Sequence, residues 1–292
     1  MENNELMSQQ DSNGMLYTVD GDLNEIISHF YHIHHLQGDT VLKHLSPSLE
    51  ILLIFNLGSS VAISFNNSCS PNEIQKGCAV IGPLKQMLNY ELKEGADAIV
   101  VNFRLSGFYR LCKIPLNNLD GQTIYDPDSQ MDKFSWNDLW ITLSQITDIE
   151  ARLTIISDYV AHYIHEIEDA VQPLIDGEHY FYNAAKNPVK AIASDAKLTE
   201  RTIQIRFQKY AGYSSKELLR FLRFKMVLSR FIGGKENSFD MFEIITTFNY
   251  HDQSHLIKDF KYFLGVTPQQ FLKDLKGKEF FTVGSGTKNP GL

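Results

Sequence analysis

The last third of the chain contains one small module written twice. Four landmarks recur at offsets of 52 or 53 residues: an apolar helix position, a turn residue, the last aromatic of a second helix and a glycine. They are Ile192, Leu198, Phe207 and Gly212 in the first copy, and Ile244, Tyr250, Phe260 and Gly265 in the second. A fixed-period repeat constrains architecture more strongly than any single residue. Each copy predicts a helix, a tight turn and a second helix, which is the helix-turn-helix plan that places a helix in a DNA groove.

The charge of the chain is unevenly distributed. The net charge of −8 would argue against nucleic-acid binding if it were spread evenly. However, residues 1–183 hold 9 Lys and Arg against 25 Asp and Glu, whereas residues 184–276 hold 16 against 9. The repeat therefore lies on the only strongly basic stretch, and a basic surface is what contacts to phosphate require.

The cysteines and the apolar runs limit where in the cell we expect the protein. Cys69, Cys78 and Cys112 are odd in number and form no CxxC pair, so we expect free thiols in a reducing compartment. Residues 1–14 lack the basic and apolar regions of a signal peptide. The longest apolar run, 51–55, is far shorter than the roughly 20 residues of a membrane helix. We expect a soluble, cytoplasmic protein with no membrane contact.

Two domains of different class are expected. Short runs rich in Ile, Val and Phe between residues 16 and 105 predict a small β-barrel or sandwich, and the apolar spacing becomes helical after Asp132. Because the repeat is helical, the predicted fold class is α+β. The expected segments are a disordered N-terminus at 1–15, a β-rich sensing and dimerisation domain with C-terminal helices at 16–170, a linker at 171–187, a double helix-turn-helix domain at 188–276 and a flexible tail at 277–292.

In the first unit, Pro188 is expected at a helix start and Thr199 at the N-cap of the second helix. Ile203, Phe207 and Tyr210 lie at positions i, i+4 and i+7, so they should be buried. The opposite face presents Arg201, Gln204, Ile205, Gln208 and Lys209. Arg and Gln can form paired hydrogen bonds to guanine and adenine. The Ile205 side chain either contacts a thymine methyl group or joins the core.

In the second unit, Asp240 and Asp252 are expected to cap the two helices, with Asn249 in a left-handed turn between them. The outward residues of its second helix are Gln253, Ser254, His255, Lys258 and Lys261. A helix at 215–232, roughly 27 Å long, would hold the two units near one DNA turn apart. It carries Lys216, Arg220, Arg223, Lys225 and Arg230, of which about half are expected to be solvated and the others to meet phosphates.

Several sequence motifs agree in order and spacing with a known family. They are Leu198–Gln204, Leu222–Phe224, Tyr250–Phe260 and Gly265–Pro268. This arrangement resembles the DNA-binding domain of AraC/XylS-type transcription regulators over about 90 residues, roughly 185–275. The resemblance implies a monomeric unit that reads successive major-groove faces of double-stranded DNA. The N-terminal half resembles, mainly in architecture, the cupin-type sensor domains often fused to this module.

Carried over by position, the resemblance implies base contacts by Arg201, Gln204, Ile205, Gln253, Ser254 and Lys258. Phosphate contacts are expected from Lys209, Lys216, Arg220, Arg223, His255 and Lys261. The chain departs from the family at three positions: Ile205 stands where the family usually has Arg, Ile245 where it has Ala, and Asn249 where it has Gly. The first departure bears on base reading, and the other two concern packing and the turn.

The N-terminal half contains polar residues whose role the sequence leaves open. The histidines that cluster there are His29, His32, His34, His35 and His44. His32 and His34 would share one strand face, and His-x-His pairs bind metal in some cupins, but no Glu or distant His falls at a convincing position. We therefore expect packing roles and no metal or cofactor. The polar residues within apolar runs either line a pocket or face solvent; they are Glu50, Asn56, Asn102 and Arg104.

The leading hypothesis is a sequence-specific transcription regulator, not an enzyme, controlled by a ligand or by dimerisation through its N-terminal domain. The expected partners are the DNA major groove, a small-molecule effector, a second copy of the chain and RNA polymerase. A cupin-type metalloenzyme with a helical accessory domain is one alternative, for which the histidine cluster is the only candidate site. The other is a protein-binding adaptor without DNA affinity.

Overall fold

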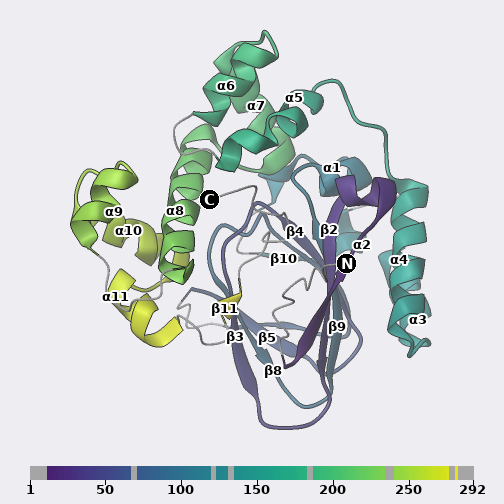
Figure 1. The fold of residues 1–292 in the computed structure, drawn as a ribbon. Coiled ribbons are helices and arrows are strands. Elements are labelled where there is room, and N and C mark those ends of the chain that lie inside the picture. The colour runs from purple at the N-terminus through teal and green to yellow at the C-terminus, as the bar shows by residue number, and fades with distance from the viewer. Residues whose placement is uncertain are drawn as a thin grey trace, which may run out of the picture.

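The computed structural model describes residues 12–66, 71–119, 123–130, 135–182, 187–233, 240–275 and 280–281. Strands dominate the N-terminal part of the chain and helices the C-terminal part (Figure 1). The predicted α+β class is therefore confirmed.

The N-terminal domain contains two sheets. The first has the strand order β1-β2-β9-β4-β7-β10, with β1 Gly14–Thr18, β2 Ile27–His35, β9 Ala96–Phe103, β4 Ile51–Asn56, β7 Gly77–Ile81 and β10 Ile124–Tyr125. The second has the order β11-β3-β8-β5-β6, with β11 Phe280–Phe281, β3 Val41–Leu45, β8 Leu88–Leu92, β5 Val61–Phe65 and β6 Asn72–Ile74. All pairings are antiparallel except that of β11 with β3, which is parallel.

Alternation along the strands builds a core between the two sheets. Ile33, Leu52 and Ile54 of the first sheet share a buried cluster with Ile63 and Phe65 of the second. The alternate residues of the same strands point from the other face of the first sheet towards helices. Side chains of these strands therefore alternate between the two faces, as expected for a β-strand.

Two polar strand residues lie inside the protein rather than at its surface. Asn56 and Asn102 are buried, so a solvent-facing interpretation is wrong for both. The Asn56 side-chain amide donates to the carbonyl oxygens of Ser59 and Ile74, at 3.1 and 3.0 Å. These two backbone partners satisfy the amide nitrogen of Asn56, whereas its Oδ1 atom is buried with no hydrogen-bond partner among the described residues.

Helices cover the outer face of the first sheet, and α3 and α4 run along it in Figure 1. The helices of this half are η1 Gly21–Glu25, α1 Gly107–Cys112, η2 Leu116–Asn118, α2 Pro127–Gln130, α3 Trp136–Ser144 and α4 Ile149–Tyr163. Trp136 is fully buried, with its ring 6.3 Å from that of Phe55 on β4. The apolar stripes of both helices thus pack within the chain.

The C-terminal domain is helical. Its elements are α6 Pro188–Asp195, α7 Glu200–Ala211, α8 Ser215–Gly233, α9 Met241–Thr247, α10 Gln253–Leu264, α11 Pro268–Gln270 and the π-helical turn η4 Phe271–Leu275. Glycines at 212 and 265 end α7 and α10 with φ of 72° and 71°, a left-handed conformation that glycine adopts without steric cost. Among the described residues, no helix is long and apolar enough to cross a membrane.

Two segments outside the predicted domains are structured. Residues 171–187 were expected to be a linker, but they include α5 Gln172–Asp176 and η3 Glu178–Tyr182. Phe181 of η3 is buried against Phe207 of α7, with ring centroids 5.7 Å apart. Within the expected tail, Phe280 and Phe281 pair with His44 and Leu45 of β3. Residues 1–11 of the expected disordered segment lie outside the described residues, whereas residues 12 and 13 form a turn and β1 begins at Gly14.

Candidate DNA-binding surface

The sequence repeat corresponds to a repeat in three dimensions. Both helix-turn-helix turns contain a non-glycine residue with a φ of 54°, Lys197 in the first and Asn249 in the second. In each turn the next N–H donates five residues back: Leu198 to the Ala193 carbonyl at 2.9 Å, and Tyr250 to the Ile245 carbonyl at 3.0 Å. The two turns therefore have the same backbone geometry.

The second helix of each unit begins at a side-chain cap that the sequence predicted. The Thr202 N–H donates to Thr199 Oγ1 at 3.1 Å, and the His255 N–H donates to Asp252 Oδ1 at 2.8 Å. The His255 backbone hydrogen bond, followed by the His251 side chain, lowers the pKa of Asp252 from its ordinary value. Asp252 thus carries the negative charge that favours a helix N-terminus.

Each of these two helices buries one face and exposes the other. Ile203 and Phe207 of α7, like Leu256 and Phe260 of α10, have no exposed surface. The residues predicted to contact bases lie on the outer faces, where Arg201, Gln253, Ser254 and Lys258 are exposed and Gln204 is partly exposed. The Ile205 side chain is 50% exposed, so the alternative that it joins the core is wrong.

Two of the arginines predicted to contact phosphate bind a buried carboxylate. Asp259 of α10 has no exposed surface. It accepts from Arg220 Nε at 2.7 Å, from Arg223 Nη2 at 3.2 Å and from the Tyr250 hydroxyl at 2.9 Å. Burial, then the Asp259 charge, raises the pKa of Tyr250. These contacts fasten α8 to α10, and Arg223 Nη2 also lies 3.1 Å from His255 Nε2.

Sequence reasoning did not identify Asp259 as the organiser of this cluster. A signal for it was present: Asp259 lies at i+3 from Leu256 and directly precedes Phe260, so it falls on the apolar face of α10. An acidic residue on such a face requires positively charged partners, because isolated buried charges are unstable. The basic residues of α8 supply them.

Lys209, also predicted to contact phosphate, faces the N-terminal domain. Its Nζ lies 5.2 Å from the ring centre of Tyr109 on α1, 4.7 Å from that of Tyr210 and 3.8 Å from Glu168 Oε2. Tyr109 hydrogen bonding, the largest of several causes, raises the pKa of Lys209. A hydrogen bond from Lys113 is the main cause that lowers the pKa of Glu168 to about 2. Lys209 is therefore occupied between the domains, whereas Lys216 and Lys261 are exposed.

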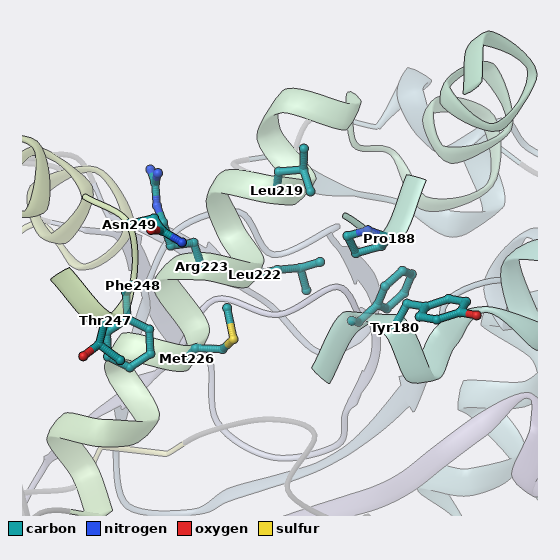
Figure 2. A pocket seen from close by; sticks show the side chains of 10 residues that line it. Tyr180, Pro188, Leu219, Leu222, Arg223, Met226, Thr247, Phe248 and Asn249 are labelled. Atoms are coloured by element: carbon teal, nitrogen blue, oxygen red, sulfur yellow. The ribbon is translucent and has the colours of Figure 1, made fainter. Parts of the chain in front are cut away.

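A hollow separates the two helix-turn-helix units along α8. In Figure 2 the side chains of Leu219, Leu222 and Met226 project from α8, between Tyr180 and Pro188 on one side and Phe248 on the other. The complete lining is Tyr180, Phe181, Pro188, Leu219, Leu222, Arg223, Met226, Thr247, Phe248 and Asn249. The units are thus connected through α8 rather than packed directly against one another at this point.

Comparison with known families and structures matches both halves of the chain. A family model described as a helix-turn-helix domain matches residues 192–274. A second, described as a domain of unknown function (DUF6597), matches residues 17–125. Comparison with curated proteins gives no match.

Solved structures similar to this chain include two of ToxT from Vibrio cholerae. One, at 1.65 Å resolution, shows 12% identity and a TM-score of 0.42 over 89% of this chain and 98% of that chain. The other, of wild-type ToxT with an unsaturated fatty acid bound, shows 12% identity and a TM-score of 0.39 over 91% and 97%. The AraC-like transcriptional activator CuxR shows 10% identity and a TM-score of 0.27 over 74% and 86%.

The duplicated and capped units agree with the family model over residues 192–274 and with the motifs Leu198–Gln204 and Tyr250–Phe260. Residues 192–274 of this chain therefore form a helix-turn-helix domain, and its motifs resemble those of AraC/XylS-type transcription regulators.

Proposed function

We propose that residues 188–276 bind specific DNA sequences by inserting α7 and α10 into successive segments of the major groove, and that residues 16–170 control this binding. The observation that carries the proposal is the pair of exposed helix faces, each beginning at a side-chain cap. Among the described residues, the side chains of Arg201, Gln253 and Lys258 make no hydrogen bond or ion pair with the rest of the protein. Their side chains are therefore available for a partner.

Base reading would rest on six residues with different chemistry. They are Arg201, Gln204, Ile205, Gln253, Ser254 and Lys258. Arg201 favours guanine, Gln204 and Gln253 favour adenine, and the exposed Ile205 favours the methyl group of thymine. Replacement of Arg201 or Gln253 by Ala should weaken binding by roughly 1–3 kcal/mol at one or two base pairs of the operator.

Phosphate contacts would come mainly from cations that are free of internal ion pairs. Lys216 and Lys261 meet this condition among the described residues, whereas Arg220, Arg223 and Lys209 have carboxylate partners. We therefore keep Lys216 and Lys261 as phosphate-binding residues and assign Arg220, Arg223 and His255 to holding α10 in place. Removal of either lysine should lower the slope of the salt dependence of binding by about one unit.

The test is selection of bound duplexes from a random DNA library with the full chain. Affinities for the selected site and its single-base variants are then measured for Gln253→Ala and for the double variant Lys216→Ala/Lys261→Ala. Gln253→Ala should relax preference at one or two positions, and the double variant should weaken all sequences alike. Lys76→Ala, an exposed lysine of the β domain, is the matched control and should bind as the unmodified protein does. Failure to enrich any sequence would refute sequence-specific binding, and equal losses across all operator variants would refute Gln253 as a base reader.

Control by the N-terminal domain is supported by contacts to both helix-turn-helix units. The Tyr213 hydroxyl, just after α7, donates to the buried Ser48 carbonyl at 3.1 Å. In the last turn of α10, the Phe263 carbonyl accepts from the Met87 N–H at 2.8 Å, and the Tyr262 carbonyl accepts from the Asn66 side-chain amide at 2.9 Å. A rearrangement of the β domain would therefore reach the C-terminal ends of both α7 and α10.

A small-molecule effector would act through the interior of the β domain. Lys43 of β3 is fully buried, an uncommon location for lysine. The full chain is screened by thermal unfolding against a panel of small anionic and neutral metabolites, and a metabolite that binds there should raise the melting temperature. Lys43→Met should abolish the response to anionic metabolites. An unchanged response of Lys43→Met to the anionic metabolites would refute Lys43 as the residue that binds an anionic effector.

Partners other than DNA belong to the same proposal. A homodimer formed through α3 and α4 would cover Ile141 and Tyr163, which are exposed large side chains. Sedimentation of the full chain, and of Ile141→Asp, tests this: the variant should be monomeric at concentrations where the unmodified chain is dimeric. Contact with RNA polymerase is tested by transcription in vitro from a template that carries the selected site.

A further inference from the structure

We propose that His32, His34 and Asp97 form a binding site for a divalent transition-metal ion on the outer face of the first sheet. The site lies in the β domain and has no part in the proposed DNA contacts. One suitable atom from each residue lies within 4.8 Å of the others. Two imidazoles and one carboxylate form the ligand set that binds Zn²⁺, Fe²⁺ and related ions while leaving coordination positions open.

Strand geometry brings the three residues together. His32 and His34 are two positions apart on β2, so their side chains leave the same face of the sheet. The ring centroids lie 5.3 Å apart. Asp97 of β9 is the antiparallel partner of His34 and therefore lies on that same face. The pairing supplies the third ligand that sequence reasoning did not find, because Asp97 and His32 are 65 residues apart.

The carboxylate of Asp97 is held in one orientation. Oδ2 accepts from Arg152 Nη1 of α4 at 2.9 Å, while Oδ1 lies 3.0 Å from His32 Nε2. Arg152 is itself buried, and its Nε donates to the carbonyl oxygen of Ile146 at 2.6 Å. Arg152 is thus an outer residue that orients a ligand, a feature of built metal sites.

The backbone of Asp97 is also constrained. Its carbonyl oxygen accepts from the N–H groups of both Leu57 and Gly58 at 2.8 Å. A side chain at Gly58 would lie 2.3 Å from the Asp97 nitrogen, so the two strand ends approach closely only because position 58 is glycine. Both the backbone and the side chain of Asp97 are therefore held in place by neighbouring groups.

An ionised carboxylate, shared with Arg152, and access from solvent meet two requirements of a cation site. Burial tends to raise the pKa of Asp97, but hydrogen bonds from His32 and Arg152 outweigh it and hold the pKa below its usual value. The carboxylate is therefore ionised, as a metal ligand must be. His34 is exposed, so an ion can enter from solvent and the His34 ring can turn to meet it.

The three proposed ligands need to move only a short distance to bind one ion together. Ligand atoms around a tetrahedral zinc ion lie roughly 3.3 Å apart, so no pair of ligand atoms would need to approach by more than about 1.5 Å. The hydrogen bond between His32 and Asp97 would be replaced by bonds from both residues to the ion. Because the imidazoles must be unprotonated, binding releases protons and should weaken on acidification.

The experiment is calorimetric titration of the full chain with Zn²⁺ and, separately, Ni²⁺ at pH 7.5 and pH 5.5. One ion per chain should bind at pH 7.5, and affinity should fall at pH 5.5. His34→Gln and Asp97→Asn should each weaken binding at least about tenfold. His162→Gln is the matched control: this exposed histidine also lies on α4, about 15 Å along the helix from Arg152, and should bind as the unmodified chain does.

Co²⁺ supplies an independent readout, since ligation by nitrogen and oxygen gives visible absorption bands that His34→Gln should lose. His34 is exposed, so His34→Gln should remain folded, and circular dichroism verifies this if Asp97→Asn does not fold. Absence of binding to the unmodified chain at 100 µM metal, or binding by His34→Gln equal to that of the unmodified chain, would overturn the proposal.

Discussion

Residue scale: Ile205 and Ile203 show how two similar side chains on one helix differ in role. Ile205 is 50% exposed on the outer face of α7, whereas Ile203 has no exposed surface. The exposed Ile205 can contact a partner without contributing much to stability. The buried Ile203 contributes to stability but cannot contact a partner.

We predict that Ile205→Ser changes the free energy of unfolding by less than about 0.5 kcal/mol, because surface substitutions rarely do more. The same change should weaken binding only to operator variants that keep one particular thymine. Ile203→Ala is the control and should lower stability by about 2–5 kcal/mol through the cavity that it creates. Chemical denaturation and DNA titration of both variants make the measurement; a large loss of stability in Ile205→Ser would contradict an exposed reading position.

Element scale: the two helix-turn-helix turns share one backbone geometry but not one residue. Both Lys197 and Asn249 have a φ of 54°. Asn tolerates this left-handed region better than Lys does, because its short polar side chain can hydrogen-bond locally. The first turn therefore holds more backbone strain than the second.

Replacement of Lys197 by Gly should consequently stabilise the chain by roughly 0.5–1 kcal/mol, as relief of the left-handed conformation exceeds the added freedom of the unfolded chain. Asn249→Gly should give a smaller gain or none. Thermal unfolding of the two variants side by side decides the order. A larger gain at Asn249 would show that local backbone preference does not dominate these turns.

The junction of α8 and α10 depends on one carboxylate. Asp259 has no exposed surface and accepts hydrogen bonds from Arg220, Arg223 and Tyr250. Asp259→Asn should therefore lower the free energy of unfolding by about 3–5 kcal/mol, because two cations lose their buried partner. Urea denaturation provides the measurement. Asp274→Asn, at an exposed aspartate of η4, is the control. A loss below about 1 kcal/mol would mean that the cluster does not hold the two helices together.

Whole-molecule scale: a buried carboxylate lies where the β domain meets α8. Burial is the main cause that raises the pKa of Glu50 to about 7, with nearby Glu178 acting in the same direction. Lys225 of α8, Ser28 and Arg104 act in the opposite direction. Burial in turn lowers the pKa of Lys225.

Stability should therefore depend on pH through Glu50. Between about pH 4.5 and 7 the folded chain keeps a proton that the unfolded chain releases, so the free energy of unfolding falls as pH rises through this window. The fall should be on the order of 3 kcal/mol. Glu50→Gln should flatten the profile and be relatively more stable at pH 8, while the exposed Glu94→Gln leaves the profile unchanged. Denaturation midpoints from pH 4.5 to 8 test this, and an unaltered profile in Glu50→Gln would contradict it.

Much of the C-terminal domain was predictable because helix ends depend on neighbours in sequence. Thr199, Asp240 and Asp252 cap helices as predicted, and Asn249 adopts the predicted left-handed conformation. Each of these features is decided by hydrogen bonds within a few residues. The β domain was less predictable: β3 and β8 are not among the runs rich in Ile, Val and Phe, and pairing between distant strands decides whether such a short segment becomes a strand.

The amino-acid sequence by itself determined the duplicated helix-turn-helix plan, its caps and the face that each reading helix exposes, since these follow from periodicity and local hydrogen bonding. Only the tertiary structure decided which basic residues remain available. Arg220 and Arg223 are paired with Asp259, and Lys209 is held at the domain interface by Tyr109. Only strand register, likewise, placed Asp97 beside two histidines. Such assemblies join residues far apart in the chain, where spacing along the sequence contains no information about distance in space.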